Sequence, residues 1–306
     1  DKFSYQQING ILVNSKHNQV IKSGIPKFLK KIKGSVAVLA QGASGYNNYA
    51  HWLFDIIPKM KILSEAYNLK IPYDKEVITN AIKDSVHLNN LSSAYIRPLV
   101  FFGEGEMGLL PKSVPVYVSV AAWNWGAYLG DDAGNQGVRV CISKWKRISP
   151  QSFKPTAKGV GGYMNSTLAK VDAVENGYDD AIMLGDNDVV AEGSGQNLFL
   201  IKNGKIYTPP IETGALGGIT RKTVIEIASK LGLETEEINI NANQLKDADE
   251  LFFTGTATEV VGVVSVDGED ISNGNPGQIT EDIRKKYLEI VNGEDEDFLH
   301  YLTLVK

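Results

Sequence analysis

Four polar, glycine-containing clusters in the second half of the chain constrain its fold more than any other feature. In chain order they are Thr156-Ala-Lys-Gly-Val-Gly-Gly-Tyr163, Glu192-Gly-Ser-Gly-Gln-Asn197, Gly217-Gly-Ile-Thr-Arg221 and Thr254-Gly-Thr-Ala257. Glu192 and Thr254 end predicted strands, and Gly217 opens a predicted helix, where small residues let a ligand approach the backbone. One such cluster alone indicates little, but four in one chain indicate a shared site.

Pyridoxal phosphate is the ligand whose chemistry these clusters share. A lysine amine such as Lys158 forms a Schiff base with the cofactor aldehyde, and a carboxylate such as Glu192 pairs with the pyridinium nitrogen. Unpaired N–H groups at a helix start, as at Thr220, bind phosphate. Each cluster also has a plainer interpretation: in chain order, an ordinary lysine in a flexible loop, a solvated glutamate at a strand end, a capped helix and a strand-to-turn junction.

A further pair of candidate residues lies upstream, on a predicted strand over residues 94–102. Tyr95 and Arg97 alternate with Ala94 and Ile96, so both project from one face. A phenol beside a guanidinium suits recognition of a substrate carboxylate. The alternative is a surface pair on an exposed sheet face.

Hydrophobic periodicity predicts a regular succession of elements from residue 73 onward. Helices are expected at about 74–90, capped by Asp74, at 165–176, and from a cap at Thr220 to Leu231. Strands are expected at 94–102, 114–122, 137–143, 180–184, 189–192, 197–201, 205–208 and 250–254. Asn203-Gly204 predicts a type I′ turn. Farther upstream, residues 35–40 predict a strand and residues 51–67 a helix.

Charge and composition narrow the class of protein. The net charge of −5 argues against nucleic acid or an anionic membrane as a partner, and we find no apolar stretch long enough to span a bilayer. Cys141 is the only cysteine, so no intramolecular disulfide forms, which fits the cytoplasm. The scattered histidines offer no metal-ligand cluster. The chain begins at Asp1 without a signal-like segment, as expected for a processed product or a fragment.

From about residue 71 to residue 306 the chain resembles the branched-chain amino acid aminotransferases, pyridoxal-phosphate enzymes of fold type IV. The stretches that carry the resemblance are Ser93-Ala-Tyr-Ile-Arg-Pro-Leu99, Trp125-Gly-Ala-Tyr-Leu-Gly130, Thr156-Ala-Lys158, Tyr163-Met-Asn-Ser166, Glu192-Gly-Ser-Gly-Gln-Asn-Leu-Phe199, Gly218-Ile-Thr-Arg221 and Gly255-Thr-Ala257. The first two favour this group over D-amino acid aminotransferases and aminodeoxychorismate lyases.

The resemblance implies an α/β (α+β) fold with a small N-terminal α/β domain and a larger pseudobarrel domain. Residues 71–122 would form the remainder of the small domain, residues 123–130 the linker and residues 131–306 the large cofactor-binding domain. Residues 1–70 form an atypical N-terminal segment. A homodimer or higher homo-oligomer and a cytoplasmic location are implied as well.

The resemblance also implies roles for individual residues. Lys158 would carry the cofactor and move the proton, Glu192 would keep the ring nitrogen protonated, and Tyr163 would bond the ring oxygen. The implied phosphate contacts are Ile219, Thr220 and Thr256. The implied substrate contacts are Tyr95, Arg97, Tyr128, Thr256 and Ala257. The expected reaction transfers the amino group of leucine, isoleucine or valine to 2-oxoglutarate.

Two departures from the family pattern stand out. Gln196 occupies a position where many relatives carry glutamate. More seriously, residues 1–70 contain no motif like H-Y-G-x-x-V-F-E-G-I-R, whose arginine clamps the cofactor phosphate, and the first arginine of the chain is Arg97. Instead, residues 46–58 resemble part of a glycosyltransferase family, a resemblance that extends over about residues 35–70.

Three accounts of the N-terminal segment follow. The chain is a fusion that has lost part of its active site; or its N-terminal lysines, Lys27, Lys30, Lys31 and Lys33, replace the arginine; or residues 1–70 are a structural cap. The functional alternatives are D-amino acid transamination, a catalytically inactive binding protein and, third, a glycosyltransferase.

Overall fold

The computed structural model describes residues 5–8, 11–14, 19–22, 65, 69–105, 108–110, 113–125, 129 and 132–303. Contacts divide the chain into two units, Asp1–Lys33 and Gly34–Lys306. In the first unit, three short strands form an antiparallel meander: β1 (Tyr5–Ile8), β2 (Ile11–Asn14) and β3 (Gln19–Lys22). The predicted strand at 35–40 and all but residue 65 of the predicted helix at 51–67 lie outside the described residues. The four-part domain division stays a prediction.

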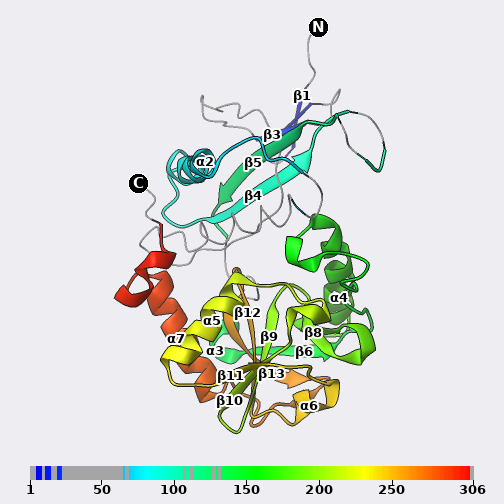
Figure 1. The fold of residues 1–306 in the computed structure, drawn as a ribbon, viewed down its shortest axis with the longest axis vertical. Coiled ribbons are helices and arrows are strands. Elements are labelled where there is room, and N and C mark those ends of the chain that lie inside the picture. Colours follow the sequence, from blue (N-terminus) through cyan, green and yellow to red (C-terminus); the bar gives the residue numbers. More distant parts are fainter. Residues whose placement is uncertain are drawn as a thin grey trace. The chain divides into compact units, whose positions relative to one another are not determined.

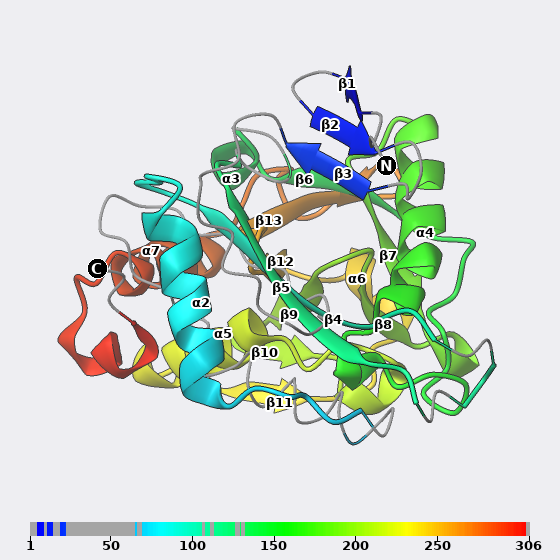
Figure 2. The ribbon, with the colours of Figure 1, turned by 90° about the horizontal axis from the view of Figure 1, so that it is seen from above.

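In the part of the second unit that the structure describes, a helix packs on a hairpin. Helix α2 (Lys75–His87) starts at Asp74, whose carboxylate accepts a hydrogen bond from the Val77 N–H at 2.9 Å, so the predicted cap is confirmed. Its buried residues Ile78 and Ile82 share a core with the antiparallel strands β4 (Tyr95–Phe102) and β5 (Val116–Trp123), and Figure 2 shows α2 lying along this hairpin. Both predicted strands are thereby confirmed.

A curled nine-stranded sheet forms most of the second unit. Its strands are β6 (Val138–Ile142), β7 (Asp180–Leu184), β8 (Val190–Gly193), β9 (Asn197–Lys202), β10 (Lys205–Thr208), β11 (Thr235–Glu237), β12 (Glu250–Gly255), β13 (Glu259–Val266) and β14 (Glu269–Asp270). The order is β11-β10-β9-β12-β13-β6-β7-β8, with β14 beside β13. The two edges approach each other, because Val190 donates its N–H to the Ile240 carbonyl at 2.8 Å, beyond the end of β11. The sheet is therefore the expected pseudobarrel.

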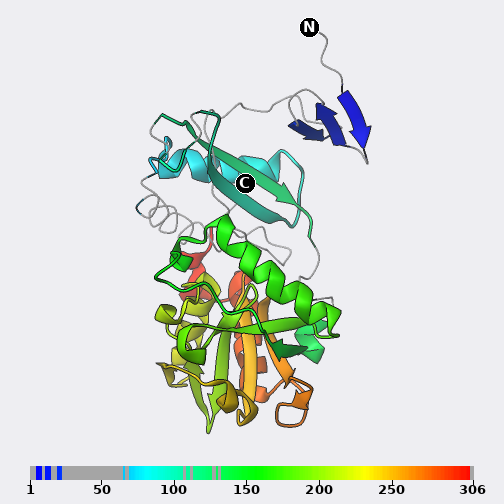
Figure 3. The same cartoon turned by 90° about the vertical axis from the view of Figure 1, so that its right-hand side faces the viewer.

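Alternate residues of the sheet serve two different cores. Leu198 and Leu200 point into the core inside the curl, whereas Phe199 and Ile201 point outward. Helices α5 (Ile219–Lys230) and α7 (Gln278–Val291) cover that outer side of β12 and β13 (Figure 1). Helix α4 (Tyr163–Glu175) packs small alanines on β7 and is the long green helix of Figure 3.

Short elements complete the unit. They are α3 (Ala133–Gln136), α6 (Ala242–Lys246), and the 3-10 turns η1 (Pro155–Ala157), η2 (Val160–Gly162), η3 (Asp186–Asp188), η4 (Ile211–Thr213) and η5 (Glu296–Tyr301). The Asn203-Gly204 turn has positive φ at both residues, 53° and 74°, as a type I′ turn requires.

The start of α5 differs from the prediction. Gly218, not Thr220, is the residue that precedes the first helical turn, so Thr220 lies one residue inside the helix. A Cβ atom on Gly218 would lie 2.0 Å from Oδ1 of Asn197, which explains why a glycine rather than a capping side chain stands there. Leu231, predicted on the apolar face, lies at the helix end and is 42% exposed.

Candidate active site

A cavity of about 240 Å³ lies where the chain segments of the four polar clusters meet β4. Nine of the ten residues predicted for the site line it: Tyr95, Arg97, Lys158, Tyr163, Glu192, Ile219, Thr220, Thr256 and Ala257. The tenth, Tyr128, lies outside the described residues. The structure thus brings together residues as far apart as 95 and 257, while their individual roles stay predictions.

Lys158 follows η1 in a left-handed backbone conformation, with φ 51° and ψ 37°. Its Nζ atom lies 5.6 Å from the ring centre of Tyr163, which begins α4. Burial disfavours the charged amine, but Tyr163, Tyr95 and Glu192 outweigh this effect, so the pKa of Lys158 is raised. In the absence of a bound molecule, Lys158 therefore carries a proton at neutral pH.

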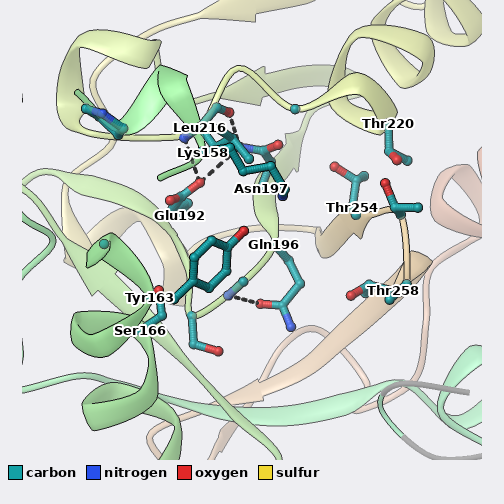
Figure 4. A pocket seen from close by; sticks show the side chains of 18 of the residues that line it. Lys158, Tyr163, Ser166, Glu192, Gln196, Asn197, Leu216, Thr220, Thr254 and Thr258 are labelled. Carbon is teal, nitrogen blue, oxygen red and sulfur yellow. Dashed lines mark hydrogen bonds between the residues drawn. The ribbon is translucent and has the colours of Figure 1, made fainter. Parts of the chain in front are cut away.

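Glu192 lies in β8, one residue before its end, as a buried carboxylate with three polar partners. Oε1 pairs with Nε of Arg147 at 2.7 Å, and Oε2 accepts hydrogen bonds from the Leu216 N–H at 2.8 Å and from Nδ2 of Asn197 at 3.2 Å (Figure 4). Burial raises the pKa of Glu192, and Arg147 is the strongest influence against that rise. Two of these partners, Arg147 and Leu216, lie outside the four polar clusters of the sequence.

The other side of the cavity is rich in hydroxyl groups. In Figure 4, Thr220, Thr254 and Thr258 gather there, away from Glu192. Ile219 and Thr220 form the first turn of α5, whose N–H groups have no partner inside the helix. The buried Oγ1 of Thr254 has no hydrogen-bond partner among the described residues. Such a group needs a polar partner, and an anion at the helix start would supply one.

Aromatic rings surround the guanidinium of Arg97 at the β4 end of the cavity. Nη2 of Arg97 donates to the Tyr95 hydroxyl at 3.1 Å, and the guanidinium lies 5.4 and 5.9 Å from the ring centres of Trp123 and Trp125. Trp125 meets Tyr95 edge to face at 4.3 Å and lines the cavity. Burial raises the pKa of Tyr95 although Arg97 opposes the shift, so the phenol stays protonated.

Comparisons with known proteins decide the family. A model described as amino-transferase class IV matches residues 61–266. The branched-chain-amino-acid aminotransferase of Pseudomonas aeruginosa is 44% identical over 239 residues, 78% of each chain, and that of Escherichia coli K12 is 39% identical over 243 residues, 79% of each. The chain belongs to the branched-chain-amino-acid aminotransferase family. It is a class IV aminotransferase of fold type IV, and its cofactor is pyridoxal 5′-phosphate.

Solved structures of this family agree with the fold. The Escherichia coli branched-chain amino acid aminotransferase aligns with a TM-score of 0.86 and 32% identity over 100% of both chains. The Thermobaculum terrenum branched-chain amino acid aminotransferase in its PLP form aligns with a TM-score of 0.82 and 30% identity over 94% of this chain and 96% of that one. The resemblance of residues 35–70 to glycosyltransferases is not borne out.

Two further features concern the part of the chain that the structure describes. No group of three or more histidine, cysteine, aspartate or glutamate side chains there is placed to hold a metal ion. None of the helices there is long and apolar enough to cross a membrane. The cytoplasmic location stays a prediction.

Proposed function

We propose that this aminotransferase transfers the amino group of leucine, isoleucine or valine to 2-oxoglutarate. The observation that carries the proposal is one cavity lined by Lys158, Glu192, the first turn of α5 and the Tyr95–Arg97 pair. The relatives' printed names support branched-chain amino acids as donors. Pyridoxal phosphate, when bound, supplies the electron sink that makes the Cα proton of an amino acid acidic.

The cavity residues fit this cofactor. Lys158 supplies the amine that binds the aldehyde, Glu192 a carboxylate for the ring nitrogen and Tyr163 a phenol for the ring oxygen. The N–H groups of Ile219 and Thr220, with Thr256, would bind the phosphate. The unpartnered hydroxyl of Thr254 in the same wall supports an anion there.

Lys158 would also move the proton. With its amine unbound, Lys158 would take the proton from the substrate Cα through Nζ and return it on the cofactor side. Tyr163 and Tyr95 lie close enough to influence the charge of this amine. Both phenols would therefore favour the state in which Nζ holds the proton.

The β4 end of the cavity would bind the substrates. Arg97 and Tyr95 offer a guanidinium and a phenol to a substrate carboxylate, and the backbone amides of Thr256 and Ala257 offer further donors. Trp125 adds an apolar ring against which a branched side chain packs. Tyr128 belongs to the same proposal through the resemblance alone.

A visible spectrum tests this function. Mixing the purified protein with pyridoxal phosphate should give a visible absorbance band of bound cofactor that is absent in Lys158→Ala. Addition of L-leucine should bleach the band, and 2-oxoglutarate should restore it. A band that ignores L-leucine but responds to D-amino acids would favour D-amino acid transamination. A band that ignores every donor would favour the inactive binding protein.

We propose further that cofactor affinity is weaker than in other family members. Of the arginines that the structure describes, only Arg97 and Arg147 line the cavity, and Arg147 is paired with Glu192. The N-terminal family arginine is missing from residues 1–70. A charged hydrogen bond to phosphate contributes roughly 1.5–3 kcal/mol, so its loss weakens binding about 10- to 150-fold. A dissociation constant equal to that of the Pseudomonas aeruginosa relative, measured side by side, would contradict this.

A homodimer is the third part of the proposal. The face of α4 directed away from β7 carries four exposed apolar residues at helical spacing, here called the α4 stripe: Met164, Leu168, Val171 and Val174. Met164 is 75% exposed and the other three about half exposed. Contiguous exposed apolar residues mark interaction surfaces, and a second copy of the chain is the partner that the family resemblance implies.

A further inference from the structure

Arg147 makes the shortest contact to the Glu192 carboxylate. The distance from its Nε to Oε1 is 2.7 Å, and the two side chains are only 12% and 5% exposed. In so enclosed a pair, removal of one partner leaves the other charge buried without compensation. The state of Glu192 therefore depends on Arg147 far more than it would at a surface.

Arg147 is itself fixed from three directions. Its backbone N–H donates to the Leu184 carbonyl at 2.7 Å, its Nε to the Gly214 carbonyl at 3.3 Å, and its Nη1 to Oγ of Ser166 on α4 at 3.2 Å. Gly214 has a φ of 98°, and a Cβ atom there would lie 3.2 Å from Cγ of Arg147. The backbone bond anchors the residue to β7, and the loop after η4 and α4 restrict the orientation of the guanidinium.

The acceptor positions of Glu192 are almost all used. Oε2 accepts from the Leu216 N–H and from Nδ2 of Asn197, which occupies both of its lone pairs. Among the described residues, Oε1 has Arg147 as its partner, so one acceptor position is left. Because Glu192 lines the cavity, that position is where an N–H donor of a bound molecule would meet the carboxylate.

We infer that Arg147 is a positioning residue, which holds Glu192 as a carboxylate in the orientation that leaves one Oε1 acceptor position for the ring nitrogen of pyridoxal phosphate. The inference rests on the proposed pairing of Glu192 with that nitrogen. Arg147 and Lys158 are the charged groups that oppose the rise in the pKa of Glu192 caused by burial. Without Arg147, burial favours the protonated acid, which no longer gives a charge-assisted hydrogen bond.

A pair of ligands isolates the effect. In 1-deazapyridoxal phosphate a C–H group replaces the ring nitrogen, while the aldehyde and the phosphate are retained. The ratio of its dissociation constant to that of pyridoxal phosphate, measured by equilibrium dialysis without substrate, therefore reports the ring-nitrogen contact alone. We expect the wild type to prefer pyridoxal phosphate, and Arg147→Met to lose about tenfold or more of that preference.

Three variants complete the experiment. Glu192→Gln should lose the preference to the same extent, and Arg147→Met combined with Glu192→Gln should lose no more than either alone. Arg284→Met removes a guanidinium that pairs with Glu281 and does not line the cavity, so it should keep the full preference. If Arg147→Met does not fold, the ligand preference is measured on Arg147→Lys instead. Lysine keeps the charge but cannot make all the contacts of the Arg147 side chain.

The outcomes separate this inference from the proposed function. A wild type that does not distinguish the two ligands would disprove the Glu192 pairing and, with it, the role of Arg147. A wild type that does distinguish them, with Arg147 variants that bind both ligands more weakly but keep the preference, would overturn the inference alone. Arg147 would then stabilise the fold without acting through Glu192.

Discussion

Gln196 donates a hydrogen bond from Nε2 to the fully buried carboxylate of Asp180 at 2.9 Å. The other end of its amide, Oε1, accepts the Gly195 N–H at 2.9 Å, which fixes the loop after β8 in the cavity wall. An amide is suited to this position because it donates and accepts at once, whereas a carboxylate only accepts. The amide of Gln196 is thereby matched to the carboxylate of Asp180.

Replacement of Gln196 by glutamate should destabilise this chain. The variant places a second carboxyl group against the buried carboxylate of Asp180, and the repulsion between them raises the pKa of the new carboxyl group in the folded state. The free energy of unfolding should fall by about 1–3 kcal/mol at neutral pH. A raised folded-state pKa favours the folded state only at low pH. The decrease in the free energy of unfolding should therefore be smaller at acidic pH and larger as the pH rises.

Gln278→Glu is the matched control for this prediction. Gln278 also donates through Nε2 to a carboxylate, that of Asp282 at 2.9 Å, but the pair is exposed. Solvent screens the new repulsion there, so urea denaturation should show a change below about 0.5 kcal/mol. Equal effects of the two substitutions would refute the buried-pair explanation.

Capture of the cofactor by Lys158 should be strongly pH-dependent. Only the uncharged amine attacks an aldehyde, and the raised pKa of Lys158 keeps most of it charged at neutral pH. The observed rate should therefore rise about tenfold for each pH unit until the pKa is reached. Stopped-flow absorbance after mixing with pyridoxal phosphate measures this profile.

Tyr163→Phe should move that profile to lower pH. Among the groups that raise the pKa of Lys158, Tyr163 is the strongest, so its removal lets burial lower the pKa. Titration of the cofactor itself is common to both proteins and cancels in the comparison. Superimposable profiles of wild type and Tyr163→Phe would show that the phenol does not control the amine.

Gly218→Ala should disturb the carboxylate end of the cavity from a distance. The added Cβ atom would lie 2.0 Å from Oδ1 of Asn197, and Nδ2 of the same side chain donates to Glu192. Forced displacement of this kind costs about 1–3 kcal/mol of stability, and cofactor affinity should fall with it. Gly217→Ala is the control, because its Cβ atom would meet nothing closer than 3.9 Å. Thermal unfolding and dialysis of both variants test the prediction, which fails if Gly217→Ala is as harmful as Gly218→Ala.

Charge in the α4 stripe should separate the two copies of the proposed homodimer. Leu168→Glu places a carboxylate at the middle of the stripe, and burial of that charge in an interface is unfavourable. Light scattering should then report half the mass of the wild type, with an unchanged helix signal in circular dichroism. Leu231→Glu, on a similarly exposed leucine outside the stripe, should keep the wild-type mass. A wild type that is already monomeric would contradict the homodimer itself.

Local patterns in the sequence predicted the cavity wall well, because each cluster combines small residues with the end of a strand or the start of a helix. Arg147 could not be found in this way, since its partner Glu192 is 45 residues away and only folding brings the two together. Helix α7 was not predicted, although Ile279, Ile283, Tyr287 and Ile290 recur at helical spacing and periodicity would have found it. Strand β13 was not predicted either. It is buried along almost its whole length, so its sequence lacks the alternation of polar and apolar residues that marks a half-exposed strand.

The left-handed backbone of Lys158 sets the demands of chemistry against those of stability at a single position. A residue with a Cβ atom loses roughly 1 kcal/mol in that conformation relative to glycine. Glycine at position 158 would thus relax the backbone of the loop and at the same time remove the amine. Selection for a more durable protein alone would drive this codon toward glycine. Lysine at this position therefore provides a reactive amine at the expense of the loop's stability.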